Sequence, residues 1–143
     1  MSASGYRFLP HTTDAYIESV GPTFENALEN AALALFDTMC NVNRVSAELQ
    51  EEVTVQGADQ LELLYNWLEC LLLKFELEHK VYNKFHVSLV SDQGALTLTA
   101  KIQGEAFNRQ KHGAKVEVKA VTYHKMEIFQ EGKVIVIRFI VDL

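Results

Sequence analysis

The chain has 143 residues, of which 48% are hydrophobic and 22% charged, and its formal net charge is −6. This composition predicts one ordered domain spanning residues 1–143, with a core large enough to be stable without disulfides. The acidic balance argues against direct nucleic-acid binding, and no apolar run approaches a membrane-spanning length, so we expect a soluble, cytoplasmic protein without membrane contact.

The first predicted elements are a strand and a helix. After a short apolar piece at 5–9 and the polar bend His11-Thr-Thr-Asp14, residues 15–20 alternate in the manner of a β-strand. Thr23 then suits a helix N-cap, and apolar residues recur at helical spacing to about Cys40. We therefore expect an amphipathic helix there, with one buried stripe.

The middle of the chain predicts a short strand and a second helix. Residues 41–52 are polar and irregular, and the alternation at 53–57 marks a short strand. Asp59 is the expected cap of a helix that runs to about His79 and carries a broad leucine-rich stripe. Such a stripe belongs to the core by default, and a groove for a transient partner is the alternative.

The second half is expected to be rich in strands. Alternation predicts one hairpin from 84–89 and 96–102, a further strand at 115–124, and a last hairpin from 126–129 and 133–141. The last segment is apolar on both faces, which is typical of a central strand. The order of elements predicts an α+β fold, in which two amphipathic helices pack on one side of a mostly antiparallel sheet.

Acidic groups stand at both ends of this predicted sheet. Asp14 opens the first alternating strand, Asp142 ends the last one, and Leu143 brings the terminal carboxylate beside it. If these ends meet, the like charges require a cation or a cluster of donors to neutralise them. Hard oxygen ligands in that number suit calcium or magnesium better than zinc. The alternative is that both aspartates cap strand ends in water and never meet.

Signs of catalysis are sparse in this sequence. It has no glycine-rich phosphate loop, no GxSxG and no HExxH motif, and its serines and cysteines lack a neighbouring base. His11 and His124 stand beside threonines, and a structural role is the simpler reading of each. Lys119 either points toward the carboxylates or is solvated, and the basic run at 109–115 forms a small patch or a solvated loop. These features favour a binding or helper role.

Several short motifs, taken together, resemble the archease family. They are His11-Thr-Thr-Asp14, Gly104-Glu105, Lys119-Ala-Val-Thr-Tyr-His124, the terminal Val141-Asp-Leu143, and Leu63-Leu-Tyr-Asn-Trp-Leu68 in the second helix. The resemblance covers essentially the whole chain in the family's order, and it implies the archease fold. It also implies a non-enzymatic co-factor of the GTP-dependent RNA ligase that joins tRNA exon halves and repairs broken RNA. Archease-like proteins help that ligase guanylylate its own active-site histidine and turn over repeatedly.

The resemblance further implies a metal site. Asp14, Asp142 and Leu143 match the family's metal-site positions, with calcium as the expected ion and magnesium or manganese as alternatives. These are the residues that the charge argument selects independently.

Three other positions are candidates for ligase activation through the same resemblance. Lys119 matches a family lysine thought to matter for activation, and His11 and Glu105 match motif positions whose roles the resemblance leaves open. Two other functions stay open as alternatives. One is a chaperone-like modulator of a tRNA cytosine-5 methyltransferase, and the other is a small metal-dependent phosphohydrolase that uses the same carboxylates.

Overall fold

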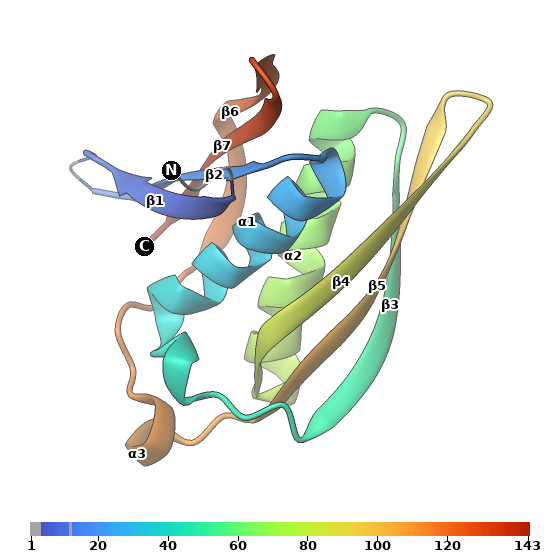
Figure 1. The fold of residues 1–143 in the computed structure, drawn as a ribbon. Helices are drawn as coiled ribbons and strands as arrows, with labels where there is room; N and C mark the ends of the chain where they lie inside the picture. Colours follow the sequence, from blue (N-terminus) through green and yellow to red (C-terminus); the bar gives the residue numbers. More distant parts are fainter. Residues whose placement is uncertain (1–3, 12) are drawn as a thin grey trace.

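The computed structural model describes residues 4–11 and 13–143, which form two antiparallel sheets with two long helices between them (Figure 1). The four-stranded sheet has the order β1-β2-β7-β6, with β1 at Gly5–Leu9, β2 at Ala15–Gly21, β7 at Val134–Asp142 and β6 at Ala120–Glu131. The three-stranded sheet has the order β3-β5-β4, with β3 at Leu49–Gly57, β5 at Ala95–Ala106 and β4 at Lys80–Asp92. The helices are α1 (Phe24–Met39), α2 (Gln60–Glu78), the single-turn α3 (Arg109–His112) and the 3-10 turn η1 (Val42–Arg44).

The α+β class and the antiparallel pairing are confirmed, but the strands divide between two sheets where one was expected. Helix α1 contacts both β2 and β4, and α2 contacts both β3 and β6, so each long helix touches both sheets. A helix that is apolar over much of its circumference must be covered on more than one side. The breadth of the leucine-rich stripe on α2 therefore accounts for the second layer of strands.

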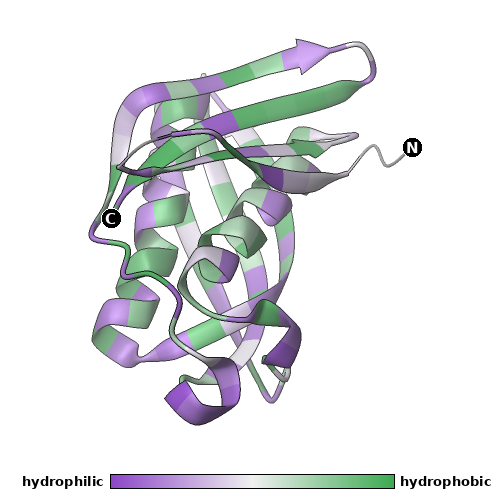
Figure 2. Cartoon of the chain, turned by 90° about the vertical axis from the view of Figure 1, so that its left-hand side faces the viewer, coloured by the Kyte–Doolittle hydropathy of each residue, from purple (hydrophilic) through white to green (hydrophobic). Residues whose placement is uncertain are grey.

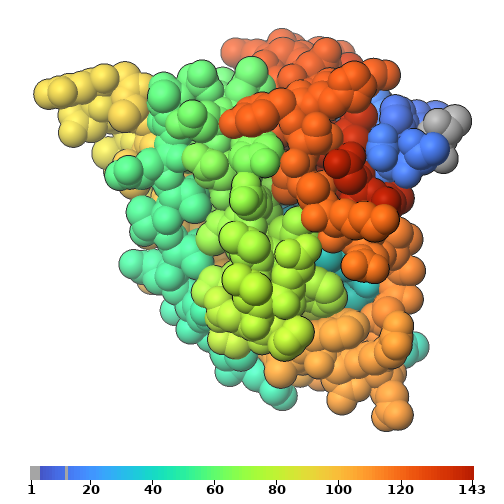
Figure 3. Space-filling model, turned by 180° about the vertical axis from the view of Figure 1, so that it is seen from behind, coloured from blue at the N-terminus to red at the C-terminus, as the bar shows by residue number. Residues whose placement is uncertain are grey.

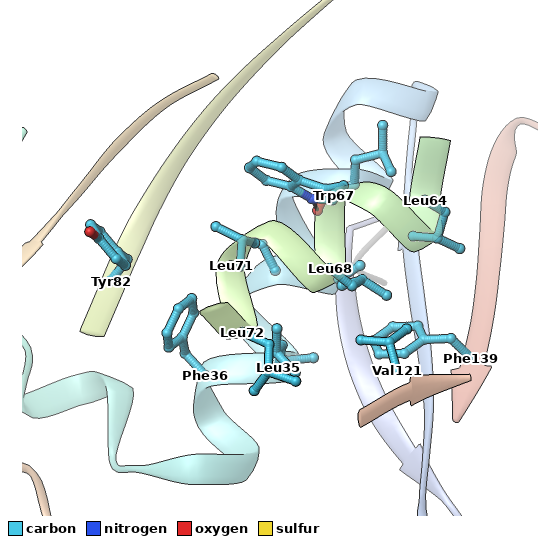
Figure 4. Close-up of a cluster of buried hydrophobic side chains, with 14 of the residues drawn as sticks. Leu35, Phe36, Leu64, Trp67, Leu68, Leu71, Leu72, Tyr82, Val121 and Phe139 are labelled. Atoms are coloured by element: carbon cyan, nitrogen blue, oxygen red, sulfur yellow. Dashed lines mark hydrogen bonds between the residues drawn. The ribbon is translucent and has the colours of Figure 1, made fainter. Parts of the chain in front are cut away.

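One hydrophobic core joins the helices to both sheets (Figure 4). Trp67 of α2, Phe36 of α1, Tyr82 of β4 and Phe139 of β7 are all fully buried. The indole Nε1 of Trp67 donates a 3.0 Å hydrogen bond to the carbonyl of Leu28, so its one polar atom is satisfied inside the core. This bond also fixes α2 against α1.

Both predicted helix caps are confirmed. The Thr23 side chain accepts from the backbone N–H of Asn26 at the start of α1, and the Asp59 side chain accepts from that of Glu62 at the start of α2. Helix α2 ends at His79, which takes the left-handed conformation at its C-cap.

Strand β3 begins earlier than its alternation predicts, because a glutamate occupies an inward-facing position. Residues 49–52 are part of the strand, and Glu51 receives hydrogen bonds from Lys74, Tyr82 and Lys80. Burial raises the pKa of Glu51, but these donors outweigh it and bring the pKa to about 2. A charged residue thus replaces the apolar one that would have revealed the strand.

The predicted strand at 115–124 is wrong in its first half. Its ladder begins only at Ala120, while the preceding segment is held by single main-chain bonds. The N–H of Lys115 donates to the carbonyl of Met39, and that of Lys119 donates to the carbonyl of Asp142, each at 2.9 Å or less. The side chains of an extended backbone alternate whether or not that backbone pairs with a neighbouring strand. Alternation alone therefore does not distinguish residues 115–119 from a paired strand.

Strand β7 is central, as its two apolar faces predict. It lies between β2 and β6, and Ile137 and Phe139 on one face and Ile140 on the other are at most 1% exposed. Figure 2 shows hydrophobic residues along both the helices and the strands. Among the described residues, no helix is long and apolar enough to cross a membrane.

Candidate metal site

The pairing of β2 with β7 brings the two ends of the chain together. In this antiparallel ladder Ala15 pairs with Val141. Asp14 immediately precedes Ala15, and Asp142 immediately follows Val141. The two aspartates therefore flank the same end of the β2–β7 ladder.

Asp14 and Leu143 also line one hollow of about 320 Å³. Asp37 and Lys115 lie in the same hollow, and the Lys115 ammonium is 2.9 Å from the Asp37 carboxylate. Asp37 therefore has a cationic partner within this hollow.

His11 lies next to the first of these carboxylates. Its Nδ1 is 3.6 Å from the Asp14 carboxylate, and its ring meets the edge of the Tyr16 ring at a centroid distance of 5.9 Å. The aromatic contact orients the imidazole beside the acid. Thr12, in the same motif, lies outside the described residues.

Lys119 is joined to Asp142 by the main chain. Its N–H donates a 2.7 Å hydrogen bond to the carbonyl of Asp142, and the next residue, Ala120, pairs with Asp142 in the ladder. The lysine side chain is exposed. His11 thus lies beside Asp14, Lys119 is bonded through its main chain to Asp142, and Leu143 lines the same hollow as Asp14.

A bulge in β6 shapes the rest of the Lys119–His124 motif, and the sequence gives no warning of it. The register shifts between Thr122 and Glu127, and Lys125 within the bulge has a φ of 58°. Its ammonium lies 5.7 Å from the centre of the Tyr16 ring, while Tyr123 stacks on Tyr65 of α2. A glycine or asparagine at the positive φ would have signalled the bulge, but a lysine stands there.

Glu105 lies elsewhere, at the end of β5 beside α3. Its carboxylate receives hydrogen bonds from Lys111 at 2.7 and 2.9 Å, from the backbone N–H of Ser46 at 2.7 Å, and from His112 at 2.8 Å. The Nδ1 of His112 accepts from the N–H of Asn108, so Nε2 carries the proton donated to Glu105. Glu105 therefore joins α3 to the loop after η1 and is not brought to the chain ends.

The basic run at 109–115 is exposed along most of its length, but it is also anchored. His112 is fully buried, and the ammonium groups of Lys111 and Lys115 are paired with Glu105 and Asp37. These three residues fasten the exposed segment to the body of the protein.

The pH dependence of stability is expected to reveal the Glu105 cluster. Burial raises the pKa of Glu105, but the bonds from Lys111, His112 and Ser46 outweigh it and lower the pKa to about 2. The ionised carboxylate thus stabilises the fold above about pH 4.5, and this contribution is lost as the pH falls toward 2. Glu105→Gln should cost about 1–3 kcal/mol of unfolding free energy near pH 7.

Urea unfolding of both proteins across this pH range checks the expectation. The difference in unfolding free energy between the wild type and Glu105→Gln should shrink steadily as the pH falls below about 4.5. Glu48→Gln, which changes an exposed glutamate of the same region, should show no such trend. If the difference in unfolding free energy between the wild type and Glu105→Gln stayed constant from pH 7 to pH 3, the ionised Glu105 carboxylate would not be the stabilising group.

The donor set at the chain ends suits a hard cation. Among the described residues, no three side chains of His, Cys, Asp and Glu are grouped to hold a metal ion. The two aspartates would therefore need the terminal carboxylate of Leu143 as a third oxygen donor. Two or three carboxylates completed by water match the ligand preferences of calcium and magnesium.

Fold and site together describe an α+β protein of two antiparallel sheets, with an aspartate next to the end of each of the paired strands β2 and β7. Residues 6–143 match the model of the archease protein family. A Sulfurisphaera tokodaii protein named archease is 38% identical over 138 residues, which are 96% of this chain and 98% of the relative. One from Pyrococcus abyssi is 43% identical over 118 residues, 82% of this chain and 83% of the relative. The chain belongs to the archease family.

Solved structures agree with this assignment. The solution structure of a Methanobacterium thermoautotrophicum protein superposes with a TM-score of 0.87 at 37% identity, and the match covers 97% of this chain and 99% of the other. The crystal structure of a Thermotoga maritima archease, described as a possible chaperone, gives a TM-score of 0.61 at 17% identity, with 96% of each chain covered. At that identity the second likeness concerns the fold alone.

Proposed function

We propose that this protein is a non-enzymatic activator of the GTP-dependent RNA ligase of tRNA splicing and RNA repair. It acts in the cytoplasm by docking on the ligase and promoting guanylylation of the ligase histidine. Membership of the archease family supports the proposal. The single observation that carries it is the pairing of Ala15 in β2 with Val141 in β7, the two residues next to Asp14 and Asp142.

In this proposal the acidic chain ends hold a divalent cation, for which calcium is the first choice. Asp14, Asp142 and the Leu143 carboxylate supply the oxygen donors, and the bound cation would supply a positive charge that offsets phosphate charge. Such a site can serve another protein because Asp142 is exposed at the surface. Neutralising phosphate oxygens lowers the electrostatic barrier to nucleotidyl transfer.

His11 and Lys119 have supporting roles in the proposal. His11 would help to position Asp14, from whose carboxylate its Nδ1 is 3.6 Å away. Lys119 is exposed next to Asp142 and is free to meet an anionic group, such as a phosphate, that approaches the site. Glu105 contributes indirectly by fixing α3 and the segment that leads to Lys119.

A guanylylation assay tests this function. Purified ligase is incubated with labelled GTP and metal, with and without the protein, and the labelled ligase is quantified over time. The proposal expects faster labelling and more than one round of ligation per ligase molecule. If the protein did not stimulate the ligase from the same organism, the proposed activator function would be wrong.

The alternatives give different results in parallel experiments. Capture of a tRNA cytosine-5 methyltransferase in place of the ligase from native extract would favour the chaperone-like role. Metal-dependent hydrolysis of nucleotide or RNA by the purified protein alone would favour a phosphohydrolase.

A further inference from the structure

An aromatic platform lies on the surface where α2 meets β6, and the candidate metal site does not use it. The rings of Tyr65 and Tyr123 stack with their centres 4.4 Å apart and their planes 10° from parallel. Tyr123 is 51% exposed, and Leu61, one helical turn before Tyr65, is 40% exposed. Figure 3 shows α2 and β6 side by side on this face of the molecule. The platform consists of Leu61, Tyr65 and Tyr123.

The bulge in β6 creates this platform. The register shift between Thr122 and Glu127 interrupts the ladder, and Tyr123 within it turns to the side of α2. Half of a large aromatic side chain thereby remains in water although the core lies close by. Exposed apolar surface of this kind next to regular structure is typical of interaction sites.

Carboxylates share the helix face of Tyr65, since Glu62 lies three residues before it and Glu69 four residues after it on α2. Asp59, Glu62 and Glu69 all act electrostatically on the Tyr123 hydroxyl, and burial, followed by Glu62, Tyr65, Asp59 and Glu69, raises the pKa of Tyr123. Burial, followed by Glu69, likewise raises the pKa of Tyr65. The face of an aromatic ring attracts a cation, and neighbouring carboxylates add to that attraction.

A shallow hollow of about 590 Å³ continues the platform between Leu61 and β6, with Ile128 and Phe129 in its wall. Within it, the guanidinium of Arg138 lies 5.1 Å from the centre of the Phe129 ring and pairs with Glu18 and Glu127. An arginine on an aromatic ring beside carboxylates is thus already part of this surface. Tyr123 offers the same combination to a cation from outside.

We propose that the platform of Leu61, Tyr65 and Tyr123, with its carboxylates, is a docking surface for an arginine-bearing segment of a partner protein. The guanidinium would stack on Tyr123 while its N–H groups meet Glu62 or Glu69. Single-stranded nucleic acid also stacks on exposed aromatic rings, but its phosphates would be repelled by the three carboxylates. The proposal is independent of the metal site and holds whichever enzyme is the partner.

Nuclear magnetic resonance titration of the full chain tests the surface. The probe is a short blocked peptide with two arginines separated by glycine, and a hexauridylate is titrated in parallel. The peptide should shift the ring signals of Tyr65 and Tyr123, and its affinity should fall as salt rises. Tyr123→Leu should weaken binding about two- to fivefold, and Tyr123→Phe should keep most of it because the ring remains.

A charge control on the same helix separates specific from general attraction. Glu69→Gln should weaken peptide binding about twofold or more, whereas Glu76→Gln removes an equal charge from an exposed position on α2 and should have little effect. Equal effects of the two variants, unchanged affinity in Tyr123→Leu, or preferential binding of hexauridylate at these rings would each overturn the proposal. Neither metal nor ligase is present, so the outcome leaves the proposed activator function untouched. The unperturbed core signals of each variant show that it is folded.

Discussion

Stimulation of ligase guanylylation is expected to fall at least about tenfold when Asp142 is replaced by Asn, and similarly for Asp14→Asn. Loss of a group that merely orients a metal ligand already weakens metal binding about 10–100-fold, so loss of a ligand should cost no less. The asparagine keeps the size of the side chain but removes the charge that a hard cation requires. Labelling of the ligase with GTP at fixed metal concentration measures the effect.

The matched control for this experiment is Asp92→Asn. Asp92 is an exposed aspartate at the end of β4, next to the tight turn of the β4–β5 hairpin, and Figure 1 shows that hairpin tip far from the C-terminus. Its replacement changes the net charge equally and should leave stimulation within about twofold. If all three variants retained full stimulation, the chain ends would have no part in activation.

Gly104→Ala is expected to lower the free energy of unfolding by more than about 4 kcal/mol. Few single substitutions have so large an effect, and a backbone clash is one cause that can produce it. In the β4–β5 ladder Gly104 pairs with Tyr82, beside a register shift in β4. A Cβ at Gly104 would overlap the carbonyl oxygen of Val81 and would lie 2.7 Å from the Cα of Tyr82. Because these are backbone atoms, the clash is relieved only by separating the two strands.

Gly94→Ala is the informative comparison for this substitution. Gly94 lies in the hairpin turn with a φ of 87°, and a Cβ there would meet nothing within 4 Å. Its replacement should therefore cost only about 1 kcal/mol, for the unfavourable backbone conformation. Urea unfolding of both variants measures the two costs, and equal costs would contradict the steric argument at Gly104.

The sequence predicts correctly those helices and strands whose hydrophobic pattern follows directly from the way they are buried. Helix α2 has both a capping aspartate and a buried leucine stripe, so its bounds of Gln60–Glu78 agree with the expected 59–79. Strand β7 was recognisable as central from its two apolar faces. Where partners override the pattern, prediction failed, as at Glu51, whose charge is neutralised by lysines distant in the sequence.

The candidate site was predictable in its residues but not in its geometry. Charge and family resemblance indicate Asp14 and Asp142, yet only the ladder shows that Ala15 and Val141, the residues next to them, pair with each other. The resemblance leaves the role of Glu105 open, and only the structure shows that it secures α3. The tyrosine platform was missed because the β6 bulge has no glycine to mark it.

A calcium titration of the purified protein by calorimetry tests most directly whether the two chain ends form one cation site. We expect about one ion per chain for the wild type and Asp92→Asn, and affinity at least about tenfold weaker for Asp14→Asn and for Asp142→Asn. The decisive feature is that either substitution alone has this effect, because both aspartates would hold the same ion. Wild-type affinity in either of these two variants would contradict the account.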